Sequence, residues 1–142
     1  MVAPEIVLDT NVLVAGLRSS RGAAHELLTR IGSGTFGINV SVPLLLEYED
    51  VLLRPDIGVA LPPGTIRDIL DYHCAVARHH AIYFLWRPCL PDPGDDMVLE
   101  LAVKAGCTFI VTFNQKDFAG CERFGIDAIT PGEFLRYLRG SG

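Results

Sequence analysis

The chain has 142 residues, of which 49% are hydrophobic and 20% are charged, and this composition suits one globular domain with its own core. No apolar run approaches the roughly 18 residues of a membrane-spanning helix, and the first residues lack the basic segment of a secretory signal, so we expect a cytoplasmic protein. The net charge of −5 excludes nucleic-acid binding through an overall positive charge. Any such contact must be local, or must involve a cation that reverses the local field.

The first half of the chain alternates short apolar runs with helix-forming patterns. Residues 6–8 are apolar without alternation, which is typical of a strand covered on both faces. Ser41 is a favourable N-cap for the residues that follow it, and either Thr10 or Asn11 can cap the first helix. The pattern predicts a strand over residues 6–8, a helix over 12–17, a helix over 24–31, a strand over 36–40 and a helix over 42–53.

The second half continues the alternation. The pattern predicts a helix over residues 65–79 capped by Thr65, an apolar stretch over 81–86 that is either a strand or a buried connector, a loop over 88–94, a helix over 95–105, a strand over 109–112, a loop over 113–124, a strand over 125–129 and a final helix. Thr130, Pro131 and Glu133 start that last helix with an N-cap, a first-turn proline and a capping box. We therefore expect one α/β domain over residues 1–142, a three-layer sandwich with a central, mostly parallel sheet flanked by helices.

Polar side chains follow two of the predicted strands. Asp9 comes directly after the first strand, and Asn114 and Asp117 follow the strand over residues 109–112. In open α/β sheets, ligands bind at the carboxyl ends of the strands. Each residue also has a simpler interpretation, because Asp9 could only cap a helix and Asn114 and Asp117 are common turn formers.

Two predicted helices place further acids beside the core. On a helical wheel, Glu47 and Glu49 lie on opposite margins of the apolar stripe of the helix over residues 42–53, whereas Asp50 points away from it. Asp95 falls within the buried arc of its own helix, and Asp96 falls outside it. A charge in a first helical turn is favoured by the helix dipole alone, but the dipole does not explain why Asp95 faces inward.

These acids are predicted to meet at one edge of the sheet. Asp9, Glu47, Asp95 and the pair Asn114 and Asp117 converge there. Carboxylates that lie close together repel one another, and burying them without a countercharge is costly. A divalent cation relieves both costs, and ligands that are all oxygen favour Mg²⁺ or Mn²⁺.

Four segments together resemble the PIN domain, a family of metal-dependent ribonucleases, and its VapC-like toxins in particular. They are residues 8–13 (LDTNVL), 41–52 (SVPLLLEYEDVL), 90–97 (LPDPGDDM) leading to Ala102 and Gly106, and 110–118 (IVTFNQKDF). Their order and spacing cover nearly the whole chain. The resemblance implies hydrolysis of an RNA phosphodiester bond with Mg²⁺ or Mn²⁺ as cofactor.

The resemblance also assigns residues to the metal. It implies that Asp9 and Asp95 hold one ion and that Glu47 orients it, with Asp96 as the alternative if the register shifts by one residue. The family often has an acid two residues after the strand threonine, where this chain has Asn114. Asp117 would then supply the charge for a second ion. The departure at Asn114 leaves open a PIN-like RNA-binding or regulatory module that has lost catalysis.

Polar and basic neighbours complete the implied site. Thr10, Asn11 and Thr112 are expected to hydrogen-bond to the acids or to the substrate. The cations that could hold RNA phosphates are Arg18, Arg21 and Lys116, although each could equally be a solvated loop charge.

Other classes fit the sequence less well. A phosphoaspartyl transferase would have a second aspartate where Asn11 stands, a receiver domain would have a phosphoacceptor aspartate at the end of its third strand, and a zinc protein would need clustered His or Cys. The resemblance further implies a homodimer and an antitoxin partner. Leu46 and Leu53 lie opposite the buried stripe of their helix, so either they belong to an interface or the helix over residues 65–79 covers them.

Overall fold

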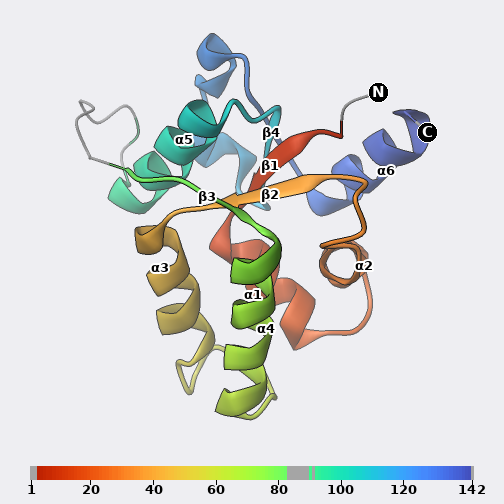
Figure 1. The fold of residues 1–142 in the computed structure, drawn as a ribbon, viewed down its shortest axis with the longest axis vertical. Coiled ribbons are helices and arrows are strands. Elements are labelled where there is room, and N and C mark those ends of the chain that lie inside the picture. Colours follow the sequence, from red (N-terminus) through yellow and green to blue (C-terminus); the bar gives the residue numbers. More distant parts are fainter. Residues whose placement is uncertain (1–2, 83–89, 91, 142) are drawn as a thin grey trace.

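The computed structural model describes residues 3–82, 90 and 92–141, and a parallel sheet runs through its centre (Figure 1). The strands are β1 (Glu5–Leu8), β2 (Gly37–Val40), β3 (Arg78–His79), β4 (Phe109–Val111) and β5 (Asp127–Ile129). They lie in the order β3-β2-β1-β4-β5, and every pairing among the described residues is parallel. The predicted α/β fold with a central parallel sheet is therefore confirmed.

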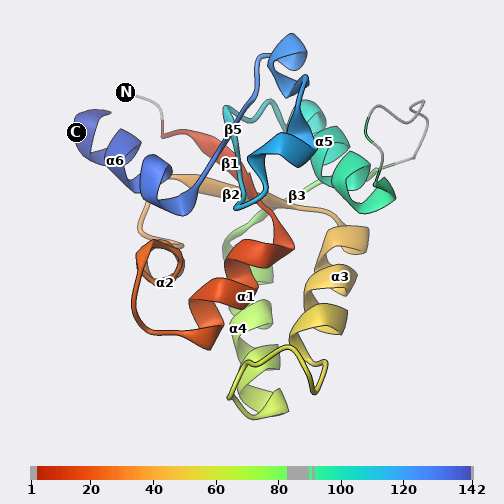
Figure 2. The same ribbon diagram turned by 180° about the vertical axis from the view of Figure 1, so that it is seen from behind.

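Helices cover both faces of this sheet. They are α1 (Thr10–Arg18), α2 (Ala23–Thr29), α3 (Val42–Leu52), α4 (Pro63–Val76), α5 (Pro93–Ala105) and α6 (Pro131–Ser141), with the 3₁₀ turns η1 (Gln115–Phe118) and η2 (Cys121–Phe124). Figures 1 and 2 show α1, α3 and α4 on one side of the sheet, α5 on the other, and α6 beside α2. No helix in the described ranges is long and apolar enough to cross a membrane.

Several helices begin earlier than predicted. The first helix begins at Thr10 rather than residue 12, and its N-cap is Asp9, not Thr10 or Asn11. The fifth begins at Pro93, two residues before the predicted start, with Asp92 as its N-cap. Proline is favoured in a first turn, where its missing N–H costs nothing. Ser41 does cap α3, since its Oγ accepts from the amide of Leu44 at 3.3 Å.

The prediction for the fourth helix was wrong at both ends. It begins at Pro63, so Thr65 is not its N-cap, and it ends at Val76 instead of residue 79. The backbone is extended at Ala77. Residues Arg78–His79 then form the strand β3, which pairs with β2. A two-residue edge strand is too short to show any periodicity. Residues 83–86 of the ambiguous stretch, and residues 88, 89 and 91 of the predicted loop over 88–94, lie outside the described residues.

The last helix closes the core as predicted. The amide of Thr130 donates to Glu133 at 2.9 Å and the amide of Glu133 donates to the Thr130 hydroxyl at 3.2 Å, which is the reciprocal capping box. Phe134 is fully buried, with its ring edge-on to Phe36 and Phe109 at centroid distances of 5.4 and 5.7 Å. These contacts fix α6 against the strands whose carboxyl ends carry the predicted site.

Candidate active site

Asp9 lies where β1 ends and α1 begins. Its amide continues the sheet by donating to the carbonyl of Val111 at 3.0 Å, and its Oδ1 accepts from the amide of Thr10 at 2.8 Å. Asp9 is therefore a helix cap, as the simpler interpretation held. Burial raises the pKa of Asp9, hydrogen bonds from Thr112 and Thr10 counteract this rise, and the charges of Glu47 and Asp117 add to it. A capping role alone does not place other carboxylates nearby.

Polar side chains hold the Asp9 carboxylate from the neighbouring strand end. The Thr112 hydroxyl donates to Asp9 Oδ2 at 2.8 Å, and Asn11 Nδ2 approaches the same oxygen at 3.4 Å. Asn11 also accepts from the amide of Phe113 at 3.3 Å. These bonds link the ends of β1 and β4, which pair at Leu8 and Val111. The carboxylate is thus fixed in orientation, as expected of Asn11 and Thr112.

Glu47 reaches the same place from α3. The Thr10 hydroxyl donates a short hydrogen bond to Glu47 Oε2. Glu49, the other marginal acid, is exposed, and Asp50 forms an exposed ion pair with Arg54 at 2.7 Å. The contact with Thr10 distinguishes Glu47 from the other acids of its helix.

Asp95 lies half-buried in the first turn of α5. Burial, together with the charges of neighbouring carboxylates, raises the pKa of Asp95 to about 6. These neighbours are, in order of decreasing effect, Asp9, Asp92, Asp117 and Glu47. Asp96 instead accepts from the amide of Leu90 at 3.0 Å. Of the two adjacent acids, Asp95 is the one whose charge is coupled to the others.

Asp117 and Asn114 follow β4 in different ways. Asp117 lies in η1, and its charge contributes to the raised pKa of both Asp9 and Asp95. Asn114 is exposed, and its amide donates to the Thr112 hydroxyl at 3.0 Å. The fourth negative charge of the cluster therefore comes from Asp117.

Two residues near the acids were not singled out in the sequence. Asp92 caps α5 by accepting from the amide of Gly94 at 2.8 Å. A Cβ on Gly94 would lie 3.2 Å from Asp92 Oδ1 and 3.4 Å from Glu47 Oε1, so the start of α5 lies against α3. The Asp-Pro pair at residues 92–93 is a helix-start signal that could have identified Asp92.

Tyr48 is the second such residue. It is fully buried, and its hydroxyl donates to the carbonyl of Leu8 at 2.5 Å. Burial raises the pKa of Tyr48 well above its ordinary value, with the charges of Asp9 and Glu47 adding to the rise. Periodicity places Tyr48 in the core stripe, but it gives no sign that the hydroxyl supports the strand end before Asp9.

The predicted cations do not gather with the acids. Arg18 is at the opposite end of α1 from Asp9, and its Nε donates to the carbonyl of Ile57 at 2.5 Å. Arg21 and Lys116 are exposed, and no hydrogen bond or ion pair joins either side chain to an acid in the described part of the chain. Their role in holding phosphates stays a prediction.

The donor chemistry of the cluster suits a hard divalent cation. Across residues 3–82, 90 and 92–141, no three Asp, Glu, His or Cys side chains form a group that could hold a metal ion as they stand. The carboxylates are nevertheless near enough to raise the pKa of Asp9 and Asp95 through their charges. A cation would offset this repulsion, and oxygen ligands fit Mg²⁺ or Mn²⁺ in kind.

Comparisons with known proteins identify the family and the fold. The family model of the PIN domain matches residues 5–116. Among solved structures, VapBC2 from Rickettsia felis, bound to a DNA fragment from their promoter, superposes with a TM-score of 0.57 and 13% sequence identity, covering 87% of this chain and 98% of that one. An identity this low shows similarity of fold alone. No curated protein matches the chain.

Proposed function

Because the chain belongs to the PIN domain family, whose members are generally nucleases, we propose that it is a metal-dependent endoribonuclease that hydrolyses RNA phosphodiester bonds. The observation that carries the proposal is the convergence of Asp9, Glu47, Asp95 and Asp117 from separate elements at the carboxyl edge of the sheet. Ligands bind at this edge in open α/β sheets. Bringing several carboxylates together at this edge costs free energy unless a cation binds between them.

In this mechanism Asp9 and Asp95 would hold the cofactor, Mg²⁺ or Mn²⁺, with Glu47 beside them. When bound, such an ion lowers the pKa of a water and offsets the negative charge that develops on the phosphate. The protein's own residues fix the acids. Thr10 donates to Glu47, and Thr112 donates to Asp9, so these two carboxylates need little rearrangement to bind a ligand.

A second cation position would involve Asp117 and Asn114. A neutral amide oxygen binds a divalent cation less strongly than a carboxylate does, so we propose that this position is the weaker one. The presence of Asn114 in place of an acid also supports an alternative function. With one negative charge fewer, the protein could be a PIN-like module that binds RNA or regulates without cutting it. The two functions differ in a single outcome, which is whether bound RNA is cleaved.

We also propose that the protein is the toxin of a toxin–antitoxin module and forms a homodimer. The similar structure of VapBC2 supports the antitoxin. Exposed apolar side chains support an interface, since Val42 and Leu46 on α3 are 66% and 63% exposed. Leu53 is partly buried because it packs against the core, so it does not belong to this exposed apolar surface. Light scattering of Leu46→Asp should give a folded monomer where the wild type gives a dimer; a wild-type monomer, or an unfolded variant, would contradict the proposed interface.

The nuclease proposal is tested by cleavage of a labelled single-stranded RNA. We expect cutting in Mn²⁺ or Mg²⁺, none in EDTA, and none by Asp9→Asn, which keeps the size of the side chain and removes its charge. Asp50→Asn is the matched control, because Asp50 is exposed and pairs only with Arg54 among the described residues. Binding of RNA without cleavage would favour the regulatory module. Equal loss of activity in Asp50→Asn would contradict the assignment of the acids.

A further inference from the structure

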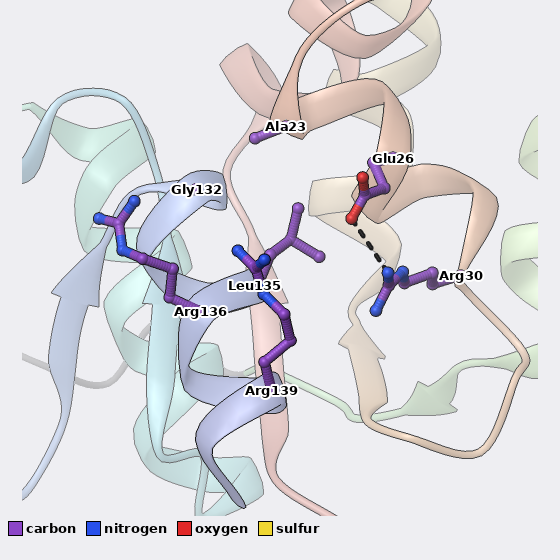
Figure 3. Close-up of a pocket in the computed structure, with 7 residues that line it drawn as sticks. All are labelled: Ala23, Glu26, Arg30, Gly132, Leu135, Arg136 and Arg139. Atoms are coloured by element: carbon purple, nitrogen blue, oxygen red, sulfur yellow. Dashed lines mark ion pairs between the residues drawn. The ribbon is translucent and has the colours of Figure 1, made fainter. Parts of the chain in front are cut away.

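A pocket of about 400 Å³ lies between α2 and α6 (Figure 3). We call it the arginine pocket, and its lining residues are Ala23, Glu26, Arg30, Gly132, Leu135, Arg136 and Arg139. In Figure 3, Arg139 of α6 and Arg30 of α2 lie on the same side of α6, whereas the Arg136 side chain extends past Gly132 on the side away from Arg30. Its volume is within the range of small-molecule sites in proteins.

The pocket is positive although the chain as a whole is negative. Arg30, Arg136 and Arg139 contribute three positive charges and Glu26 one negative charge, which leaves +2 in a chain of net charge −5. Glu26 neutralises Arg30 through an ion pair at 3.0 Å. In the described part of the chain, neither Arg136 nor Arg139 forms an ion pair. Arg136 does lie near Glu133, whose pKa is lowered first by hydrogen bonds with Thr130 and to a lesser extent by the charge of Arg136. Both guanidinium groups are exposed and can bind an anion.

Hydrogen bonds connect the loop after β4 to the first turn of α6. Gln115, which directly follows Asn114, donates to Glu133 in the first turn of α6 at 3.0 Å and to the carbonyl of Ala128 at 3.1 Å. The Arg136 guanidinium lies 3.9 Å from where a Cβ would stand on Gly132, in the same turn. The first turn of α6, which contributes Gly132 to the pocket, is therefore bonded to the η1 turn that also carries Asp117.

The lining favours phosphate over a protein ligand. Its apolar side chains are only Ala23 and Leu135, and Leu135 is buried, so no exposed apolar anchor is offered to a peptide. Guanidinium groups match the paired oxygens of a phosphate. Such interactions hold a nucleic-acid strand without reading its sequence.

We propose that the arginine pocket binds backbone phosphates of the RNA strand that is cut at the acid cluster. This inference rests on the proposed nuclease function and adds a second part to its substrate site. It also gives an acidic protein a local positive surface that can hold RNA, although the net charge of the chain is −5. Arg136 and Arg139 bind the phosphates, whereas Arg30 remains paired with Glu26.

The test is the affinity of a labelled single-stranded RNA of mixed sequence, measured by fluorescence anisotropy in EDTA so that no cleavage occurs. We expect Arg139→Gln to weaken binding several-fold, and Arg136→Gln with Arg139→Gln about tenfold. The slope of log affinity against log salt should fall by about 0.7 for each phosphate that the variant no longer neutralises. Arg67→Gln is the matched control, because Arg67 is an exposed arginine on α4, away from α6 in Figures 1 and 2.

Each outcome decides between the proposals. Equal affinity and slope in Arg139→Gln and Arg67→Gln would overturn the arginine pocket, even if the wild type cleaves RNA in Mn²⁺. An affinity that depends on Arg139 in a protein that does not cleave RNA would support the pocket and contradict the nuclease. A glutamate-rich peptide that competes with RNA as strongly as unlabelled RNA does would show a site for acidic protein segments, and would also overturn the proposal.

Discussion

Asp95→Asn should make the metal-free protein more stable at pH 7. Burial and neighbouring carboxylates raise the pKa of Asp95 from its ordinary 3.8 to about 6. Between these pH values the native state binds the proton more tightly than the unfolded chain does. The unfolding free energy of the wild type therefore falls as the pH rises through this interval, and above it the full loss persists. The asparagine side chain does not ionise, so the unfolding free energy of the variant does not fall for this reason.

The magnitude follows from the pKa difference. The interval from 3.8 to about 6 corresponds to about 3 kcal/mol at 1.36 kcal/mol per unit. Water reaches much of the half-buried carboxylate and screens it, so we expect about 1 kcal/mol. The variant also loses the attraction between an anion and the N-terminus of α5, about 0.3 kcal/mol. The repulsion is larger, and the net gain should raise the melting temperature by about 2 °C.

The assay is urea unfolding in EDTA, followed by circular dichroism at several pH values from about 4 to 8. The stability gap between Asp95→Asn and the wild type should be absent near pH 4 and should widen up to about pH 7. Asp96→Asn is the control, since Asp96 lies in the same turn and an amide oxygen can still accept from Leu90. A gap that does not depend on pH, or a variant less stable than the wild type at pH 7, would refute the reasoning.

Two buried polar groups give further predictions. Tyr48→Phe removes the donor to the Leu8 carbonyl and should cost about 1–2 kcal/mol in urea unfolding; RNA cleavage should fall as well, and an unchanged rate would show that the hydroxyl does not help to position Asp9. His73 is buried, with no partner for Nε2 among the described residues, and burial lowers its pKa below the ordinary 6.5. The unfolded chain takes up the proton first, so stability should fall as the pH drops below 6.5. His73→Leu should lessen that fall, and an equal fall in both proteins would exclude His73 as its source.

The sequence predicted those parts of the site that depend on local patterns. Asp9 follows an apolar run, Glu47 borders the buried face of its helix, and Asp95 falls within the buried face of its own, so local patterns could place each of them. Proximity between the acids depends on which strands are neighbours. The pairing of β1 with β4 brings Thr112 to Asp9 across more than a hundred residues, and no strand order was predicted from the sequence.

The features that the sequence analysis missed have sequence signals that are too short or that compete with one another. Pro63 and Thr65 both favour a helix start, and the choice of Thr65 followed side-chain capping where the proline preference prevailed. Arg78–His79 is too short for a strand pattern. The arginine pocket unites α2 with α6, and no local pattern shows that Arg30 and Arg139 lie on one surface.

The central claim, that the acids at the carboxyl edge of the sheet bind a divalent cation, is tested most directly by titrating Mn²⁺ and following the decrease of the free-ion signal by electron paramagnetic resonance. We predict saturable binding by the wild type, loss of that binding in Asp9→Asn, and normal binding in Asp50→Asn. A wild-type protein that binds no Mn²⁺ at millimolar concentration, or an Asp9→Asn protein that binds it as well as the wild type does, would contradict the claim.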